Sequence, residues 1–162
     1  MNSRDENLER LGFPLDRATP EGKLVDAVAI DGETIYASGQ VPFDGNELTY
    51  VGKVPTDVSL EDATRAAALC AANVLRAVRK VVGSLDNIGR VVRITGYVNS
   101  DANFTEQHVV INGASNLVRD VFGDDGRHAR TAIGVAQLPL GAAVEVEMIL
   151  RLKSKKNCSA PK

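Results

Sequence analysis

The sequence predicts an α+β domain with the element order β-β-α-β-α-β-β, and three observations favour this fold class. Two short apolar segments flank Asp31-Gly32, a dipeptide that favours a tight hairpin because both turn positions need positive φ. Two longer segments carry apolar residues at helical spacing, and each ends before a glycine. Three further segments have strand patterns. We therefore expect two helices packed on one face of a mixed sheet.

The N-terminal part is predicted to be an arm at residues 1–23 with at most two helical turns. The first hairpin then predicts strands at 24–30 and 34–38. The stretch 42–55 contains glycines and prolines and is predicted to be a loop. We expect the main domain to span 24–152.

Both long helices have local start or stop signals. Ser59 is the predicted N-cap of a helix at 60–82, because its hydroxyl can accept a hydrogen bond from a free N–H of the first turn. Gly83 ends that helix, and Gly123 ends a second helix predicted at 106–122. The stop signals make both boundaries specific.

Strands are predicted at 90–99, 129–136 and 143–152. In the last of these, successive side chains point alternately to the two faces of the sheet. One face of this last strand carries Val144, Val146, Met148 and Leu150. The other face carries Ala143, Glu145, Glu147, Ile149 and Arg151. The first face can pack on the helices, whereas the second is partly apolar and needs a cover that homo-oligomerisation can supply.

Composition excludes several classes. The 162 residues fit one domain with its own core, and the net charge of −2 with 4% aromatic residues is not that of a nucleic-acid-binding protein. The basic cluster at 153–156 falls in a predicted solvated tail, 153–162. No segment has the length of a membrane span or the pattern of a secretory signal, so we expect a cytoplasmic protein. Cys70 and Cys158 are predicted to be unpaired thiols.

Metal and cofactor motifs are not seen in the sequence. His108 and His128 are the only histidines, and neither they nor the cysteines have metal-ligand spacing. No nucleophile elbow, phosphate loop or dinucleotide fingerprint is present. We therefore expect no metal and no cofactor.

Two lone charges remain unexplained by these patterns. Arg130 begins an otherwise uncharged strand, and Glu145 lies within a second apolar strand. A guanidinium fits a carboxylate bidentately, and a carboxylate can order or deprotonate a water. The pair predicts a pocket for a small acidic molecule with a water held against it.

Several motifs together resemble the RidA (YjgF) family, formerly labelled endoribonuclease L-PSP, and in particular a subgroup with a longer N-terminus. The matching segments are Ser38-Gly-Gln-Val-Pro42, Ala129-Arg-Thr-Ala132, Leu138-Pro139 and Val144-Glu-Val-Glu147. The resemblance implies a chorismate-mutase-like (YjgF-like) fold and a homotrimer with ligand pockets in the clefts between subunits. It also implies hydrolytic deamination of carboxylate-bearing enamines and imines, shed by pyridoxal-phosphate enzymes, to keto acids and ammonia.

The same resemblance implies roles for individual residues. Arg130 matches the arginine that grips the substrate carboxylate, and Glu145 matches the glutamate associated with the attacking water. Asn112 matches a pocket asparagine, Gly39 matches a glycine of the pocket wall, and Ala132 holds a position whose backbone carbonyl accepts a hydrogen bond from the imine nitrogen.

Alternatives remain at this stage. The family's pocket tyrosine aligns with Val25, which removes a hydrogen-bonding group and favours a non-catalytic module that binds keto acids. A dedicated deaminase for an aminomuconate-like intermediate is another reading, and RNA cleavage is disfavoured by the net charge. Arg130 could instead be structural, paired with Asp124, Asp125 or Glu145, Asn112 could be a satisfied polar residue, and Glu147 could take the role of Glu145.

Overall fold

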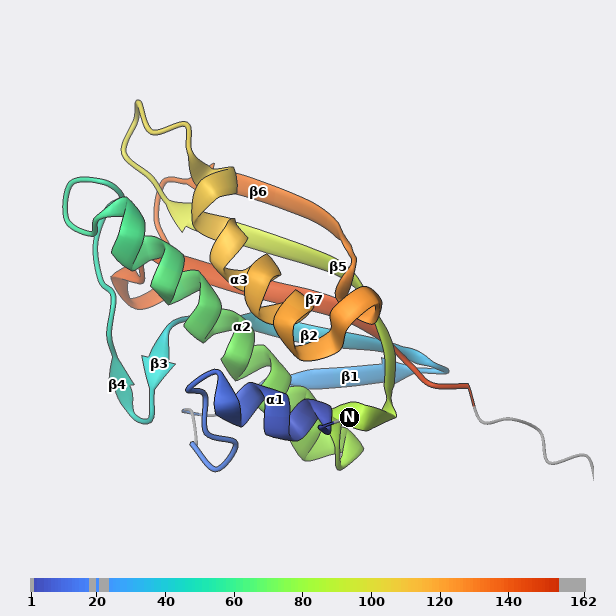
Figure 1. The fold of residues 1–162 in the computed structure, drawn as a ribbon. Helices are drawn as coiled ribbons and strands as arrows, with labels where there is room; N and C mark the ends of the chain where they lie inside the picture. Colours follow the sequence, from blue (N-terminus) through green and yellow to red (C-terminus); the bar gives the residue numbers. More distant parts are fainter. Residues whose placement is uncertain (1, 18–19, 21–23, 155–162) are drawn as a thin grey trace, which may run out of the picture.

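A computed structural model describes residues 2–17, 20 and 24–154 and has two layers, one of strands and one of helices (Figure 1). The main sheet has the order β1-β2-β7-β5-β6. Its strands are β1 Val28–Asp31, β2 Thr34–Gln40, β7 Val144–Leu152, β5 Ile88–Asn99 and β6 Ala129–Val135. The helices are α1 Arg4–Arg10, α2 Leu60–Val82 and α3 Gln107–Phe122, with 3₁₀ turns at Leu85–Asn87, Gly123–Gly126 and Pro139–Gly141.

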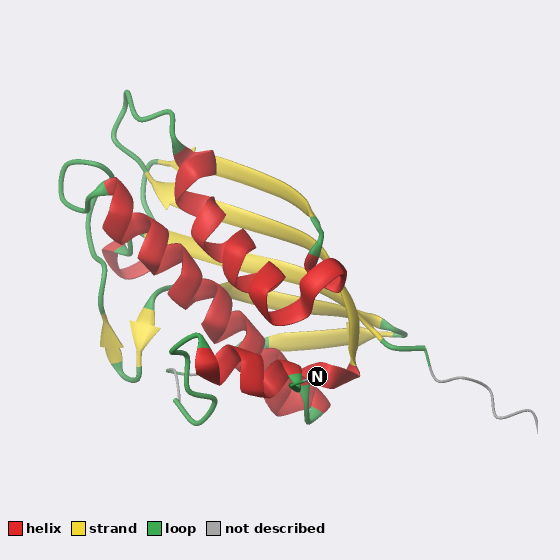
Figure 2. Cartoon of the chain, in the orientation of Figure 1, coloured by secondary structure: helices red, strands yellow, loops and turns green. Residues whose placement is uncertain are grey.

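The sheet is mixed, as predicted, because β6 runs parallel to β5 while the other neighbours are antiparallel. The two long helices cover the same face of the sheet, and no helix of the described residues lies over the opposite face (Figure 2). This arrangement confirms the predicted α+β fold class and the order of its seven main elements.

Two local predictions are wrong. The predicted loop at 42–55 contains a small hairpin of β3 Phe43–Asp44 and β4 Glu47–Leu48, turned at Gly45 with φ of 64°. The first strand begins only at Val28, and Leu24 and Val25 before it are 95% and 69% exposed. Apolar composition alone extended the predicted strand too far.

The N-terminal arm lies against the helical layer. Ser3 caps α1, and Leu8 of that helix is fully buried. Arg4 stacks over the ring of Phe122, with 4.8 Å between its guanidinium carbon and the ring centroid, so the arm contacts the end of α3. Residues 18–19 and 21–23 of the predicted arm, and 155–162 of the predicted tail with Cys158, lie outside the described residues.

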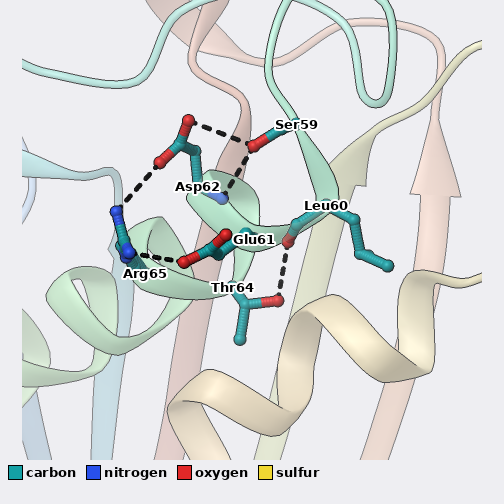
Figure 3. Close-up of polar contacts among 6 residues, drawn as sticks. All are labelled: Ser59, Leu60, Glu61, Asp62, Thr64 and Arg65. Atoms are coloured by element: carbon teal, nitrogen blue, oxygen red, sulfur yellow. Dashed lines mark hydrogen bonds and ion pairs between the residues drawn. The ribbon is translucent and has the colours of Figure 1, made fainter.

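The start of α2 agrees with its predicted cap, as Figure 3 shows. The hydroxyl of Ser59 accepts a hydrogen bond from the backbone N–H of Asp62 at 3.1 Å. Arg65, one turn further, contacts the carboxylates of Glu61 and Asp62, and the hydroxyl of Thr64 donates to the carbonyl of Leu60 at 2.8 Å. These contacts complement the free N–H groups and the dipole at the helix start.

Helix α3 crosses α2 at very short range. A β-carbon placed on Gly113 would overlap the backbone carbonyl of Thr64, so only glycine permits this approach. The crossing fixes the position of the α3 residues on either side of Gly113, including those described next.

The two faces of β7 differ as the alternation predicts. Val144, Val146, Met148 and Leu150 are buried beneath the helices. The opposite face of the sheet, which we call the outer face, carries Tyr36, Tyr97, Ile133, Glu145, Glu147 and Ile149. Tyr36 is 49% exposed and Ile133 is 43% exposed on this face, so large apolar groups lie uncovered in the single chain.

Candidate functional site

Arg130 lies on the face of β6 that is turned toward the helices, in register with buried Ile94 of β5. Its Nη1 donates to Asn112 Oδ1 at 2.9 Å and to Ser115 Oγ at 3.1 Å, and its Nη2 donates to the carbonyl of His108 at 3.3 Å. All three acceptors belong to α3. The structure therefore brings Arg130 and Asn112, two predicted site residues, into direct contact.

No carboxylate within the described part of the chain forms an ion pair with Arg130. Asp124 pairs instead with Arg127 at 3.3 Å, and Asp125 pairs with Arg4 at 2.5 Å. The structural alternative for Arg130, a pairing with these aspartates, is not what the structure contains.

The guanidinium keeps part of its donor capacity unused. It has five N–H groups, and three of them find acceptors on α3. Nε–H and one N–H of Nη2 have no acceptor among the described residues. These two nitrogens form one edge of the planar fork, the geometry that accepts a carboxylate through two parallel hydrogen bonds.

Glu145 and Gly39 form a second group, on the outer face. A bulge between Ala37 and Gln40 of β2 places Gly39 against the side chain of Glu145, and a β-carbon on Gly39 would overlap Oε1 of that glutamate. The carboxylate therefore lies in space that only a glycine leaves open. Gly39 and Glu145, both predicted site residues, are in contact.

Burial sets the electrostatics of this second group. Partial burial raises the pKa of Glu145, and the neighbouring charge of Glu147 raises it further. Tyr97 is the register partner of Glu145, and its phenol donates to Oε1 of Glu147 at 3.2 Å. Burial and both carboxylates raise the pKa of Tyr97, so its proton stays in place to donate.

The two groups lie on opposite faces of the sheet. Arg130 pairs with Ile94 on the helix side, whereas Glu145 pairs with Tyr97 on the outer side. The expectation that both charges line one pocket is therefore not met within a single chain. A site that uses both must take them from two chains.

The other predicted residues take less direct positions. Ala132 shares the face of Arg130, pairs with Gly96 and packs partly against the core. Val25 precedes β1 and is largely exposed. Two surface hollows of about 600 and 550 Å³ are lined by other residues, and none of the predicted site residues lines either one.

Sequence reasoning missed Ser115 and His128. The hydroxyl of Ser115 lies 3.0 Å from Nε2 of His128, and Nδ1 of the same ring lies 2.6 Å from the carbonyl of Gly126. Burial lowers the pKa of His128, the hydrogen bond with Gly126 opposes this, and the charges of Arg130 and Arg119 lower the pKa further. A histidine directly before the Ala-Arg motif was the available signal.

In the residues that the structure describes, no three His, Cys, Asp or Glu side chains gather in a way that could hold a metal ion. No helix of the described ranges has both the length and the apolar character to cross a bilayer. Cys70 is a fully buried free thiol, and burial raises its pKa well above the ordinary value.

Comparison with known proteins places this geometry in a family. The family model described as Endoribonuclease L-PSP matches residues 15–151. The chain belongs to this family. Protein TCP17 of Trypanosoma cruzi is a relative that is 40% identical over 149 residues, which cover 91% of this chain and 93% of that protein.

Solved structures agree with the fold. The protein Atu1372 of unknown function from Agrobacterium tumefaciens is 42% identical and superposes with a TM-score of 0.87, covering 93% of this chain and 92% of its own. RidA from an Antarctic Psychrobacter is 24% identical, with a TM-score of 0.59 over 85% of this chain and 95% of its own, and supports the fold alone.

Proposed function

We propose that this RidA-family protein hydrolyses small carboxylate-bearing enamines or imines to keto acids and ammonia. The observation that carries the proposal is the guanidinium of Arg130, which α3 fixes through three hydrogen bonds while its Nε and Nη2 edge stays open. A fixed fork of two free donors suits one carboxylate. The exposed amide of Asn112 stands beside it as a further polar contact.

The reaction needs little beyond positioning. A protonated imine carbon is already electrophilic, so the carboxylate clamp fixes that carbon relative to a water. The water oxygen bonds to the carbon while the C=N π electrons move to nitrogen, giving a carbinolamine. One proton passes from the added oxygen to nitrogen, and the C–N bond breaks with its electron pair going to nitrogen. The second proton leaves the oxygen as the carbonyl forms, so the products are keto acid and ammonium. No cofactor takes part.

Glu145 is proposed to hold the attacking water and to accept its proton. Its partial burial beside Glu147 raises its pKa, which makes it a better proton acceptor than an ordinary surface glutamate. The backbone carbonyl of Ala132 is proposed to accept a hydrogen bond from the imine nitrogen. Gly39 keeps the space into which the Glu145 carboxylate extends.

The complete site is proposed to form between subunits of a homotrimer, where a cleft joins Arg130 and Asn112 of one chain with Glu145 and Gly39 of the next. Two observations support this assembly. The two groups lie on opposite faces of the sheet in one chain, and the outer face exposes Tyr36 and Ile133, which a neighbour would cover.

The test measures keto acid formation while an amino-acid oxidase generates the imine continuously, with spontaneous hydrolysis in buffer subtracted. Wild type should exceed buffer, and Arg130→Ala should lose that excess while keeping its fold. Arg130→Lys should also be poor, because an ammonium does not reproduce the fork. Equal turnover by wild type and Arg130→Ala would contradict the proposed role of this residue.

A second candidate function is binding of a keto acid without turnover. It is favoured by Val25, which is largely exposed and offers no hydrogen-bonding side chain where the family has its pocket tyrosine. Wild type that binds pyruvate but gives no excess over buffer with several imines would favour this candidate. A dedicated aminomuconate-like substrate remains a narrower version of the first proposal.

A further inference from the structure

Arg130 is one end of a chain of hydrogen bonds that continues into the protein. Its Nη1 donates to Ser115 Oγ at 3.1 Å, and that oxygen lies 3.0 Å from Nε2 of His128. Nδ1 of His128 lies 2.6 Å from the carbonyl oxygen of Gly126. The chain joins β6, α3 and the 3₁₀ turn before β6.

The chemistry of the two ends fixes the direction of the two outer hydrogen bonds, and the neutral ring fixes the one between Ser115 and His128. A carbonyl oxygen only accepts, so Nδ1 of His128 carries the proton toward Gly126. A guanidinium only donates, so Ser115 Oγ accepts from Arg130. Ser115 Oγ could accept a second hydrogen bond only from a ring that is protonated on both nitrogens, and burial beside two cations disfavours that charged ring. In the neutral ring, Nε2 is unprotonated and accepts the hydroxyl hydrogen of Ser115. The ring is thereby assigned to the neutral Nδ1–H tautomer.

We propose that Ser115 and His128 are positioning residues that hold the guanidinium of Arg130 with its Nε and Nη2 edge open to a carboxylate. The role of that edge rests on the proposed function, whereas the hydrogen-bonded chain does not. An arginine side chain has many rotamers, and a ligand that must order it binds more weakly. Two residues that order it beforehand remove that loss.

The surroundings of His128 favour the neutral ring that the chain requires. Burial lowers its pKa, and the charges that act on it are the cations Arg130 on β6 and Arg119 on α3. The acids nearest to His128 in the sequence, Asp124 and Asp125 of the 3₁₀ turn, form ion pairs with Arg127 and Arg4. A bound anion that neutralises Arg130 should in turn raise the pKa of His128, because coupling between two sites is reciprocal.

The tautomer of His128 tests the series of hydrogen bonds from Arg130 to Gly126 without any ligand. Nitrogen-15 NMR distinguishes the two neutral tautomers of histidine. The protein has only two histidines, so the signals that disappear in His108→Ala belong to His108 and the rest to His128. Wild type at neutral pH should show the Nδ1–H tautomer at His128. Ser115→Ala should keep this tautomer, because Gly126 still accepts from Nδ1, but should shift the Nε2 resonance, because Nε2 loses its hydrogen-bond donor. An Nε2–H tautomer in wild type, or spectra that do not change in Ser115→Ala, would overturn the inference.

Affinity for pyruvate tests the consequence. Ser115→Ala and His128→Ala should each weaken binding by about 3- to 10-fold, the size expected for loss of one hydrogen bond. His128→Gln should recover most of this, because its Oε1 can accept from Ser115. Asn116→Ala is the matched control, since it changes an exposed residue of the same helix next to Ser115.

The outcomes separate this inference from the proposed function. If Arg130→Ala loses pyruvate binding while Ser115→Ala and His128→Ala bind like wild type, the carboxylate clamp stands and the positioning role is wrong. If wild type does not bind pyruvate, the carboxylate clamp is wrong. The tautomer of His128 then decides alone whether the series of hydrogen bonds from Arg130 to Gly126 exists. Pyruvate that binds wild type and raises the pKa of His128, but not in Arg130→Ala, supports both.

Discussion

At the scale of single residues, the site depends on one position where a side chain is not tolerated. Gly39 lies against Glu145, and the atom that a β-carbon would meet is the far end of a flexible side chain. The backbone of β2 therefore need not move when this glycine is replaced, but the carboxylate must. Gly39 thus governs where Glu145 holds its charge.

Gly39→Ala should consequently keep the fold and lose most of the imine turnover. A loss of about 10- to 100-fold is expected, approaching that of Glu145→Gln, because both variants remove a placed carboxylate. The check is a double-mutant cycle with Glu145→Gln, in which the two losses should not add. Additive losses would mean that Gly39 acts independently of Glu145.

Glu145 should also leave a signature in stability against pH. Burial raises its pKa in the folded state, so its contribution to stability is present below the ordinary glutamate pKa and is lost as pH rises through the raised one. The Glu145→Gln variant has no ionisable group here, so it does not lose this stability as pH rises. The variant should therefore be more stable than wild type at pH 7, and the difference should vanish near pH 4, as urea midpoints at both values would reveal. A higher stability of Glu145→Gln that persists at pH 4 would show that it does not come from the raised pKa of Glu145.

At the scale of elements, the crossing of α2 and α3 is what presents the clamp. Gly113 lies between Asn112 and Ser115 in α3 and contacts the carbonyl of Thr64 in α2. A side chain here meets backbone, which cannot turn aside as a glutamate can. The two glycines therefore differ in what their replacement should cost.

Gly113→Ala should destabilise the fold by about 1–3 kcal/mol, the usual cost of overpacking, and should weaken pyruvate binding because α3 is displaced. Ser59→Ala is the control, since it removes the cap of α2 at a cost of about 1 kcal/mol but leaves the crossing intact. Denaturation and binding measured on both variants check this. Unchanged binding in a destabilised Gly113→Ala would separate the crossing from the clamp.

Many helix ends and buried strand faces could be predicted from the sequence, because the signals for them are local. Ser59 and Gly83 lie at the ends of α2 as predicted, and the alternation in β7 assigns its buried face correctly. The contact between Arg130 and Asn112 could only be implied by family resemblance, since it depends on how α3 lies over β6. The separation of Arg130 from Glu145 could not be predicted, because it depends on strand register.

At the scale of the whole molecule, the placement of Arg130 and Glu145 on opposite faces would make assembly part of the proposed chemistry. A ring built from one repeated interface gives every cleft the same two halves. Light scattering should give three times the 17.3 kDa mass of the chain. A stable monomer at micromolar concentration would contradict the proposed site.

Two inactive variants should therefore restore one another. When Arg130→Ala and Glu145→Gln chains are co-expressed in equal amounts, about one cleft in four receives Arg130 from one chain and Glu145 from its neighbour. Turnover near a quarter of wild type is expected from the mixture, against almost none from either variant alone. No recovery in mixed trimers would mean that both residues act within one chain or not in the same cleft.

In the proposed trimer, the opposite placement of Arg130 and Glu145 would also tie catalytic output to the amount of protein present. A chain that leaves the proposed trimer should keep its helices and its core but would hold only half of each proposed site. Specific activity should then fall on dilution below the concentration at which subunits separate, while the circular dichroism of the chain stays that of a folded protein. Synthesis of more subunits would raise activity more than proportionally in that range, so expression level itself becomes a switch.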